Sequence, residues 1–529
     1  MVNHNAPDIV VVGAGHNTLT AAAYLARCGQ RVLVLERNGF VGGGAVSRPL
    51  TLPGFIHDSH ATNVNLLQRH PILAKDELGL KGQFGLKFNF PPVSYMAIFE
   101  DGQSLAVHVS LDATCEEIAH YSPHDADAYR KLMTMAAGLG PVMGLAMFRP
   151  PVSLGALMSM MERLPHGSEY LRLMFMSGSE LVLELFEHPR VRLLFLRWAG
   201  EMSLSPFEKG SALTLLSLLG GAHAAPGGVA IGGTQSLSDA MVRSIEADGG
   251  EIRVNAPVHK IINERGVARS VLLESGEVIT ARKAVIAAIH PHVLGDMVEG
   301  LDPGLVERAK KARVSAYSGI SMQFALNERP DWISGPQAHS CMSINLIDNA
   351  SLEELEDSFT ALKRGRMPGY FTAYANVHTN HDPSRAPTGK HTLNVWKWAP
   401  FELDRLGAAA WDNVKDVVAD RIVVDLQRYI RNLTPDNILA RHVATPLDHL
   451  RHTPSFQQGD VVGLDMSSGQ LFGMRPTSEL SQYNVPGAEG LYLCGPFMHP
   501  GGGLMGGGRP VAIRIMEQLK VNYDKVIRS

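Results

Sequence analysis

Cysteine and charge are both scarce in this sequence, and each scarcity excludes a class of protein. The four cysteines lie far apart and form no CxxC pair, which excludes a zinc ribbon and a disulfide framework. Charged residues make up 19% of the chain and the net charge is -4, so a basic face for nucleic acid is not expected. We therefore predict a reducing, cytoplasmic location and no nucleic-acid partner.

Targeting, membrane-spanning and metal-binding motifs are missing as well. The first residues run into a strand without a basic region, so we expect no secretory signal. No uninterrupted apolar run reaches the roughly 18 residues that a membrane-spanning helix needs. HExxH, clustered Cys and His ligands and GxSxG are also absent, so we expect neither a metal ion nor an α/β-hydrolase.

The N-terminal segment has the pattern of one βαβ unit. A β-branched run predicts a buried parallel strand, and an alanine-rich segment after it predicts a helix followed by a second short strand. Gly29 stands just past the helix, where a left-handed cap is expected. The predicted elements are a strand at 8–12, a helix at 18–27 and a strand at 31–36.

The turn between this strand and helix is suited to a dinucleotide. Gly13 permits the tight turn, and Gly15 lets the backbone approach a pyrophosphate at the positive end of the helix. Glu36 ends the second strand, where a carboxylate binds a ribose 2′-hydroxyl and repels the extra phosphate of NADP. Thr18 replaces the usual third glycine, and we expect binding to survive this change. Other candidate contacts of this cradle are Ala14, Asn17 and Arg37.

A second glycine cluster follows the ribose-binding acid. Gly42, Gly43 and Gly44, with Ala45 behind them, would let a long cofactor pass close to the backbone. An NAD-binding chain has no need of such a cluster, whereas FAD brings its pyrophosphate and ribityl chain past this region. A surface turn is the alternative interpretation. We predict that the cofactor is FAD.

A length of 529 residues favours two domains. The pattern of predicted strands, helices and turns changes several times along the chain. Three segments have the short strands and turns of a cofactor domain: 1–60, 226–300 and 481–529. The segments between them, 61–225 and 301–480, are irregular or mixed. We therefore predict an α/β fold with an α+β insert. Its Rossmann-type FAD-binding domain is discontinuous and carries an inserted mixed sheet-and-helix substrate domain.

Four sequence motifs resemble the phytoene-desaturase-like branch of the FAD-dependent amine oxidase superfamily. They are VVVGAGHNTLTAAAYLA, LVLERNGFVGG, LPGFIHDSHATN and LYLCGPFMHPGGGLMGGG. This branch includes carotenoid desaturases, carotenoid ketolases and the pyridine nucleotide-disulfide oxidoreductase domain-containing protein 2 type. The resemblance covers essentially the whole chain and is specific for the fold and cofactor, but poorly specific for the substrate.

The resemblance also implies which distant residues complete the cofactor site. Val258 would flank the adenine, and Gly495 would lie near the ribityl and phosphate region. The segment 499–508 would follow the flavin, with contacts from Gly503, Leu504 and Gly506. From the residues themselves, a glycine cluster followed by Pro510 predicts a helix start that stabilises negative charge. Relatives often carry Gly-Asp or Gly-Ala where this chain has Gly495-Pro496, and proline cannot donate an N–H.

Four residues are candidates for proton transfer. His57, Asp58 and His60 lie where the chain should leave the cofactor domain. His499 lies in the flavin segment, and we expect its pKa to be near working pH. A structural hydrogen-bonding role is the alternative for each residue taken singly. We expect the two segments to meet near the flavin.

Residues 131–161 are rich in methionine, and two interpretations stay open. They could form core helices, or they could form a flexible apolar wall or a surface for peripheral membrane contact. Together with the resemblance, this segment suggests an oxidoreductase that desaturates or oxidises a lipophilic, polyene- or isoprenoid-like substrate by hydride transfer to flavin N5. The alternatives are a redox-neutral isomerase or hydratase that uses reduced FAD, and a non-catalytic flavin-containing interaction protein.

Overall fold

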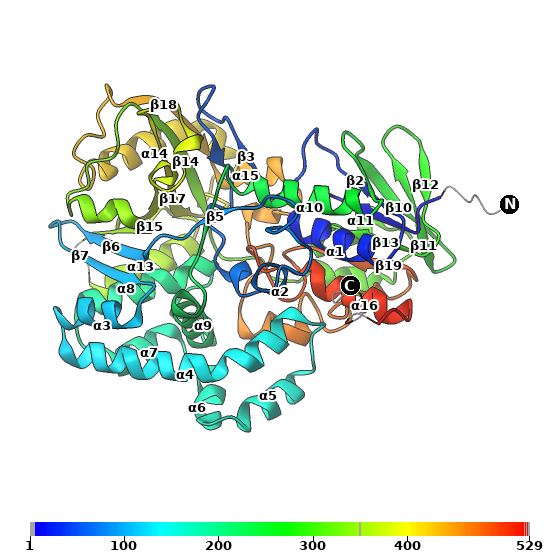
Figure 1. Ribbon diagram of the computed structural model, residues 1–529, viewed down its shortest axis with the longest axis horizontal. Coiled ribbons are helices and arrows are strands. Elements are labelled where there is room, and N and C mark those ends of the chain that lie inside the picture. Colours follow the sequence, from blue (N-terminus) through cyan, green and yellow to red (C-terminus); the bar gives the residue numbers. More distant parts are fainter. Residues whose placement is uncertain (1–5, 349–350, 523, 525, 527–529) are drawn as a thin grey trace.

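A five-stranded parallel sheet forms the right-hand half of the molecule in Figure 1. The computed structural model describes residues 6–348, 351–522, 524 and 526. The strand order is β19-β13-β1-β2-β9, and every neighbouring pair is parallel. The strands are β1 (Ile9–Val12), β2 (Val32–Leu35), β9 (Glu251–Arg253), β13 (Ala284–Ala287) and β19 (Leu491–Leu493). The sheet thus joins three segments that are far apart in the sequence.

Three helices lie together against this sheet (Figure 1): α1 (His16–Arg27), α10 (Gln235–Ala247) and α16 (Gly508–Gln518). The helices α1 and α16 cross so closely that a Cβ on Gly508 would lie 1.9 Å from the Asn17 carbonyl oxygen. Only glycine fits at this crossing. An antiparallel layer of β10 (Val258–Glu264), β11 (Val267–Leu273) and β12 (Val278–Thr280) completes this half.

A seven-stranded mixed sheet forms the other half, in the order β18-β14-β17-β16-β15-β6-β7. Only β15 and β6 pair in parallel. The strands are β6 (Val93–Phe99), β7 (Ser104–His108), β14 (Ser318–Leu326), β15 (Cys341–Ile347), β16 (Thr372–Asn376), β17 (His391–Ala399) and β18 (Ile438–Ala444). Two short ladders connect the halves: β3 (Ser47–Arg48) with β4 (His57–Asp58), and β5 (Phe88–Asn89) with β8 (Val229–Ala230).

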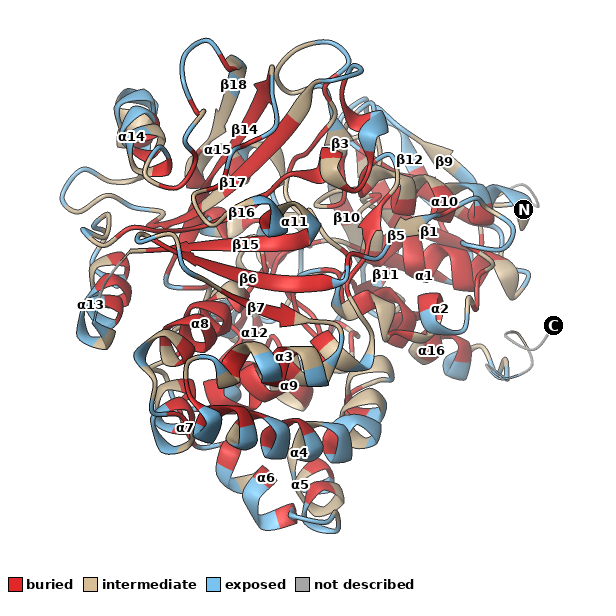
Figure 2. Cartoon of the chain, turned by 60° about the vertical axis from the view of Figure 1, so that its left-hand side comes forward, coloured by how far each residue is buried: buried red, intermediate tan, exposed pale blue. Residues whose placement is uncertain are grey.

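Each face of the mixed sheet is buried against helices, because side chains alternate along its strands. In β6, Tyr95 and Ala97 join the core under the helical layer, whereas Met96 and Ile98 join the core on the side of α14. Figure 2 shows the inner strands β6, β14, β15 and β16 buried and the outer surfaces of α4, α5 and α14 exposed. The helices of this half are α3 (Leu111–Ala119), α4 (Pro123–Phe148), α5 (Leu154–Glu162), α6 (Gly167–Leu173), α7 (Gly178–Leu185), α8 (Pro189–Ala199), α9 (Ser211–Ala224), α13 (Leu352–Lys363), α14 (Trp411–Leu426) and α15 (Pro446–His452). Short helices elsewhere are α2 (Pro71–Ala74), α11 (Leu294–Met297) and α12 (Pro303–Lys310).

This architecture confirms the predicted fold class. The sequence prediction differs from the structure in the residues at which some helices begin or end. The first helix begins two residues before the predicted Thr18, at His16, because Gly15 serves as its N-cap. The last helix begins at Gly508, before Pro510. Gly29 has the expected left-handed backbone, with φ +82°. The domain boundaries themselves stay a prediction.

The methionine-rich segment forms α4 and α5. Met133 and Met161 are buried, whereas its other methionines are only partly buried. Within the described residues, α4 is long and apolar enough to cross a membrane by length and composition, and 22% of its apolar window is buried. This corrects the expectation that no such candidate exists. The expectation counted uninterrupted apolar residues, whereas the glycines of α4 interrupt the run without adding charge.

Candidate functional site

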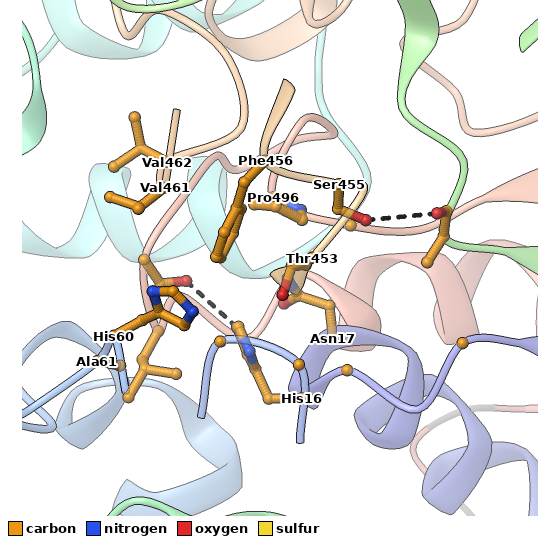
Figure 3. Close-up of a pocket in the computed structure, with 18 of the residues that line it drawn as sticks. His16, Asn17, His60, Ala61, Thr453, Ser455, Phe456, Val461, Val462 and Pro496 are labelled. Atoms are coloured by element: carbon orange, nitrogen blue, oxygen red, sulfur yellow. Dashed lines mark hydrogen bonds between the residues drawn. The ribbon is translucent and has the colours of Figure 1, made fainter. Parts of the chain in front are cut away.

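A cavity of about 500 Å³ runs from the carboxyl ends of β1, β2 and β13 to the seven-stranded sheet. Parallel sheets bind ligands at this edge, and the volume is typical of a cofactor or substrate site. Figure 3 shows His60, Phe456 and Pro496 around the part of the cavity next to His16 and Asn17. Predicted site residues that line the cavity are Gly13, Gly15, Asn17, Thr18, Glu36, Arg37, Gly43, Gly44, His60, Val258, Gly495, Gly503 and Leu504.

The other predicted site residues stand behind the cavity wall. Ala14 donates its N–H to Glu36 Oε2 at 2.8 Å, and Gly42 donates its N–H to the Ala14 carbonyl at 2.8 Å. A Cβ on Gly42 would lie 2.4 Å from the Ala45 carbonyl oxygen. A Cβ on Gly506 would lie 2.7 Å from His70 Nε2. These four residues therefore support the wall through backbone contacts.

The Glu36 carboxylate is buried and fixed in place at one end of the cavity. Besides Ala14, it accepts the Asn38 N–H and the Asn38 Nδ2 group on Oε1, each at 2.9 Å. A carboxylate offers about four acceptor positions, so capacity remains for a ribose hydroxyl. Asn38 was not identified from the sequence, since a polar residue after the acid carries no distinguishing signal there.

The glycine turns leave room along the cavity floor that side chains would fill. A Cβ on Gly43, where φ is +59°, would lie 3.0 Å from the Gly15 Cα. Gly503 has φ +74° and open space on its Cβ side. Thr18, in place of the third glycine, donates its hydroxyl to the carbonyl oxygens of Gly13 at 2.6 Å and Gly15 at 3.0 Å. A narrow groove with a positive helix end and an anchored carboxylate fits the phosphate and ribose groups of FAD.

The N-terminal and C-terminal motifs meet at this floor. Asn17 Oδ1 accepts the Gly507 N–H at 3.0 Å, and His16 Nε2 lies 3.3 Å from the Gly503 carbonyl oxygen (Figure 3). Loss of water around His16 lowers its pKa to about 4, so its ring is neutral at pH 7. The start of α1 thereby fixes the loop that precedes α16.

Pro496 lacks an N–H, but its carbonyl holds the loop in place. Arg475 is fully buried and donates from Nη2 to the Pro496 carbonyl at 2.9 Å. The same guanidinium donates to the carbonyls of Leu464 and Asp465 at 3.1 and 2.9 Å. Burial lowers the pKa of Arg475 to about 10. Proline is thus accommodated at 496 because Arg475, whose hydrogen bonds here all go to backbone oxygens, holds the loop through the Pro496 carbonyl.

The opposite end of the cavity is lined by large aromatic side chains from several elements. Tyr95 on β6 stacks on Trp198 of α8 with ring centroids 4.3 Å apart. Tyr374 on β16 accepts a hydrogen bond from Asn63 Nδ2 at 2.8 Å. Burial raises the pKa of both tyrosines, so their hydroxyls keep their protons. Trp396 of β17 also lines this end.

One carboxylate, that of Glu201, lines this aromatic end of the cavity. It pairs with Arg197, whose side chain is 1% exposed and lies 3.9 Å above the Trp398 ring. Arg197 Nε also donates to Thr372 Oγ1 at 2.7 Å. Glu201 therefore has a buried cationic partner. Sequence reasoning missed this pair because opposite charges four positions apart in a helical stretch suggest an ordinary surface ion pair.

Of the four candidate proton-transfer residues, His60 alone lines the cavity within the described chain. Its two ring nitrogens are buried and make no hydrogen bond there. Burial, and then the neighbouring His449 and His452, lower its pKa well below the usual value. Its ring also lies 5.0 Å from that of Phe456. The neutral His60 ring is thus available to hydrogen-bond a bound group.

His57 and Asp58 sit behind the wall in a buried network. Asp58 accepts hydrogen bonds from the Thr234 N–H at 2.9 Å and from Arg385 Nη1 at 2.6 Å. Burial is the largest single influence and favours a raised pKa, but Arg385, His378 and the hydrogen bonds to the carboxylate together outweigh it and hold the pKa of Asp58 below its usual value. His57 Nε2 lies 2.8 Å from Thr51 Oγ1. The ion pair of Asp58 with Arg385 joins the segment 1–60 to the segment 301–480.

His499 does not line the cavity and differs from its prediction. It is 1% exposed, and its ring lies 6.3 Å from that of Phe472. Burial and the nearby Arg475 lower its pKa to about 3, so the expected pKa near working pH is wrong. Its segment does approach that of His60 across the cavity through Gly503 and Leu504.

A possible group of metal ligands lies on another part of the chain. His124, Asp125 and Glu187 place ligand atoms within 4.8 Å of one another. The two carboxylate oxygens of Asp125 already accept the N–H groups of Glu187 and His188, at 2.8 and 2.9 Å. This cluster joins the start of α4 to the start of α8 and does not line the cavity.

These features match a known family. The model for flavin containing amine oxidoreductases matches residues 19–507, and this chain belongs to that family. It is an FAD-dependent oxidoreductase of the amine oxidase superfamily, in the branch that includes carotenoid oxidoreductases, and the prediction of FAD is confirmed.

Individual relatives are distant but cover the chain. It is 29% identical to pyridine nucleotide-disulfide oxidoreductase domain-containing protein 2 of Rattus norvegicus, over 97% of this chain and 94% of that protein. It is 24% identical to a phytoene desaturase of Cercospora nicotianae, over 96% and 89%. The structure of cyclohexylamine oxidase from Brevibacterium oxydans IH-35A has the same fold, with TM-score 0.59, 17% identity and coverage of 97% and 100%.

Proposed function

We propose that this enzyme desaturates or otherwise oxidises a lipophilic, polyene- or isoprenoid-like substrate. The observation that carries the proposal is the wall of the cavity beyond the glycine loops, which is mostly aromatic and aliphatic. Its members include Tyr95, Trp198, Met202, Leu218, Trp396 and Val462. Such a wall binds a hydrocarbon chain by excluding water from it. The named activity of the Cercospora relative agrees with this proposal.

We assign the cofactor contacts to the groove at the other end of the cavity. The turn from Gly13 to Asn17 would hold the pyrophosphate and Glu36 the ribose. Val258 would flank the adenine, Gly495 would lie near the ribityl and phosphate region, and Gly503 and Leu504 would contact the flavin. When bound, FAD accepts a hydride from the substrate.

One unpartnered polar side chain among the described residues lies at the junction of the two ends of the cavity. His60 lines the cavity, is neutral, and has ring nitrogens without a partner in the described structure. We propose that His60 hydrogen-bonds the bound groups at the junction of the two ends. The paired Glu201 would orient substrate without an unpaired charge in the wall.

We also propose that α4 makes peripheral contact with a membrane, because a membrane would supply a lipophilic substrate. No charged residue lies between Lys131 and Arg149, and Leu145 is 46% exposed. Leu145→Glu should weaken co-sedimentation with phosphatidylcholine vesicles several-fold. Leu183→Glu on α7 is the matched control, since Leu183 is also 46% exposed. Equal sedimentation of all three proteins would contradict the contact. The cytoplasmic location stays a prediction.

Anaerobic mixing with a polyene tests the proposed reaction. The FAD-loaded enzyme should lose its oxidised-flavin absorbance when phytoene in detergent micelles is added, and a more unsaturated product should appear. Isomerised product without net flavin reduction would favour the redox-neutral alternative. No reaction with any isoprenoid, together with reduction by an amine, would refute the proposal.

A further inference from the structure

A small side pocket, called the annex below, opens from the aromatic end of the cavity. One of the side chains that line it is the cationic Arg69. The volume of the annex is about 40 Å³, and it shares part of its wall with the main cavity: Asn65, Leu66, Tyr95, Trp198 and Leu218. The remaining wall includes Arg69, Ser94 and Gly221. A chain that fills the main cavity could therefore extend its end group into the annex.

Arg69 has no carboxylate partner among the described residues. Its recorded hydrogen bond runs from Nη2 to the Ser217 carbonyl at a long 3.3 Å. Burial lowers its pKa from the usual value, although an arginine stays charged at neutral pH. A half-buried guanidinium with five N–H donors and one weak acceptor is incompletely satisfied. Binding of an anion would compensate this cost.

The helix next to Arg69 leaves space for its guanidinium. A Cβ on Gly221 of α9 would lie 2.8 Å from Arg69 Nη2 and 3.0 Å from its Cζ. Any other residue at 221 would displace the guanidinium from its position along the annex. The cation is thus held by the local shape of the fold, as a recognition site requires.

Ser94 supplies a second, independent polar group. It is 5% exposed, and its hydroxyl has no hydrogen-bond partner in the described structure. It lines the annex together with Arg69, whereas Leu66, Leu218 and Met342 make the rest of the wall largely apolar. Unpartnered buried hydroxyls are uncommon and cost free energy. A donor hydroxyl beside a cation is suited to the two oxygens of a carboxylate.

We propose that the annex is a carboxylate subsite, so that the substrate is a lipophilic carboxylic acid with its apolar chain in the main cavity. Arg69 would bind the carboxylate and Ser94 would donate a hydrogen bond to it. The inference rests on the proposed function, which places the reacting part of the substrate in the main cavity. What it adds concerns only the binding of the other end of the substrate. It predicts that, among lipophilic chains, those with a terminal acid bind more tightly than neutral ones.

Matched ligands test the subsite without turnover. Farnesoic acid and its methyl ester have the same chain and differ in charge at one end. Each ligand is titrated at pH 7.5, by anaerobic calorimetry, into enzyme whose bound FAD has first been reduced with dithionite, so that no hydride can be accepted and the heat gives the dissociation constant. We expect the acid to bind about tenfold or more tightly than the ester, as for a charge-assisted hydrogen bond.

Variants assign that preference to the annex. Arg69→Met should abolish the preference, Arg69→Lys should keep part of it, and Ser94→Ala should reduce it about threefold. Arg421→Met is the control, because the Arg421 side chain is 76% exposed on α14, outside both cavities. FAD content and far-UV circular dichroism verify folding of each variant.

The outcomes separate this inference from the proposed function. Equal affinity for acid and ester, or an unchanged preference in Arg69→Met, would overturn the subsite even if hydrocarbons reduce the flavin. A preference lost in Arg69→Met and kept in Arg421→Met would support it even if neither ligand is oxidised.

Discussion

The two ends of the cavity are built in different ways. At the dinucleotide end, backbone atoms of short glycine-rich segments form the surface, and Glu36 is the main side chain. At the substrate end, side chains from separate elements form the surface, among them Tyr95 on β6, Trp198 on α8 and Tyr374 on β16. The first end is specified by local sequence, and the second is specified by how strands and helices pack.

This difference has a consequence for function. A backbone surface binds the same phosphates and ribose in many proteins, since its shape depends on a few glycines. A side-chain surface changes with each substitution and can give relatives different substrates. Substitutions at the two ends should therefore separate cofactor affinity from substrate turnover.

The largest effect is expected where α1 crosses α16. In Gly508→Ala, the new methyl group would lie 1.9 Å from one backbone atom, Asn17 O, and 2.7 Å from another, Ala21 N. Backbone on both sides cannot yield, so we expect loss of about 3 kcal/mol of stability and of bound FAD. Thermal unfolding and FAD content measure this. Gly140→Ala in α4 meets nothing within 4 Å and should behave as wild type; a stable, FAD-loaded Gly508→Ala would disprove the tight crossing.

A smaller loss is expected from Glu36→Ala. Removing the carboxylate leaves the Ala14 N–H without its acceptor and removes the proposed ribose contact, which should weaken FAD binding about 10–100-fold. Fluorescence quenching on FAD titration measures the dissociation constant. Glu274→Ala is the control, because Glu274 is an exposed residue of the same cavity rim. Equal affinities of the two variants would remove Glu36 from the site.

A third variant acts on the substrate end alone. Tyr374→Phe removes the hydroxyl that accepts from Asn63, so substrate should bind in a less fixed orientation. We expect flavin reduction to slow about three- to tenfold while FAD affinity stays within about twofold. The control is Tyr483→Phe, since the buried Tyr483 hydroxyl has no partner among the described residues. A change in FAD affinity in Tyr374→Phe would show that the two ends are not separable.

The smallest effect concerns how the stability of the fold depends on pH, because burial keeps the histidines near both ends of the cavity neutral. The pKa of His499 is about 3 in the folded chain, against about 6.5 when unfolded. The unfolded chain therefore binds the proton first, so His499 leaves the free energy of unfolding unchanged above pH 6.5 and lowers it as pH falls from 6.5 toward 3. This residue alone should cost about 2 kcal/mol at pH 5.

His499→Leu should reduce the fall in melting temperature between pH 7.5 and pH 5. His120→Leu is its control, since His120 is exposed. Identical pH profiles for both variants and the wild type would mean that His499 is protonated in the fold.

Local patterns predicted most of the dinucleotide end and little of the other. Gly13, Gly15 and Glu36 act within one βαβ unit, so their spacing is sufficient to place them. Gly503 was found through the resemblance to a family. His16 was missed because its contact depends on the distant loop that carries Gly503, and Asn38 was missed because a polar residue after the acid carries no distinguishing signal.

The substrate end could not be predicted from spacing. Tyr95, Trp198 and Tyr374 are ordinary aromatic residues in their local sequences and become neighbours only through the seven-stranded sheet and α8. The prediction for His499 failed for a related reason. Its pKa is lowered first by burial and then by Arg475, a residue whose role in holding backbone carbonyls has no local signature.

The most direct test of the account combines both ends in one measurement. The purified enzyme is titrated to full FAD occupancy, and the flavin spectrum is followed under anaerobic conditions after phytoene or farnesoic acid is added. The account predicts FAD reduction by at least one of these lipophilic compounds, slowed in Tyr374→Phe and unchanged in Tyr483→Phe. FAD that stays oxidised with both compounds and is reduced by a small polar amine would contradict it.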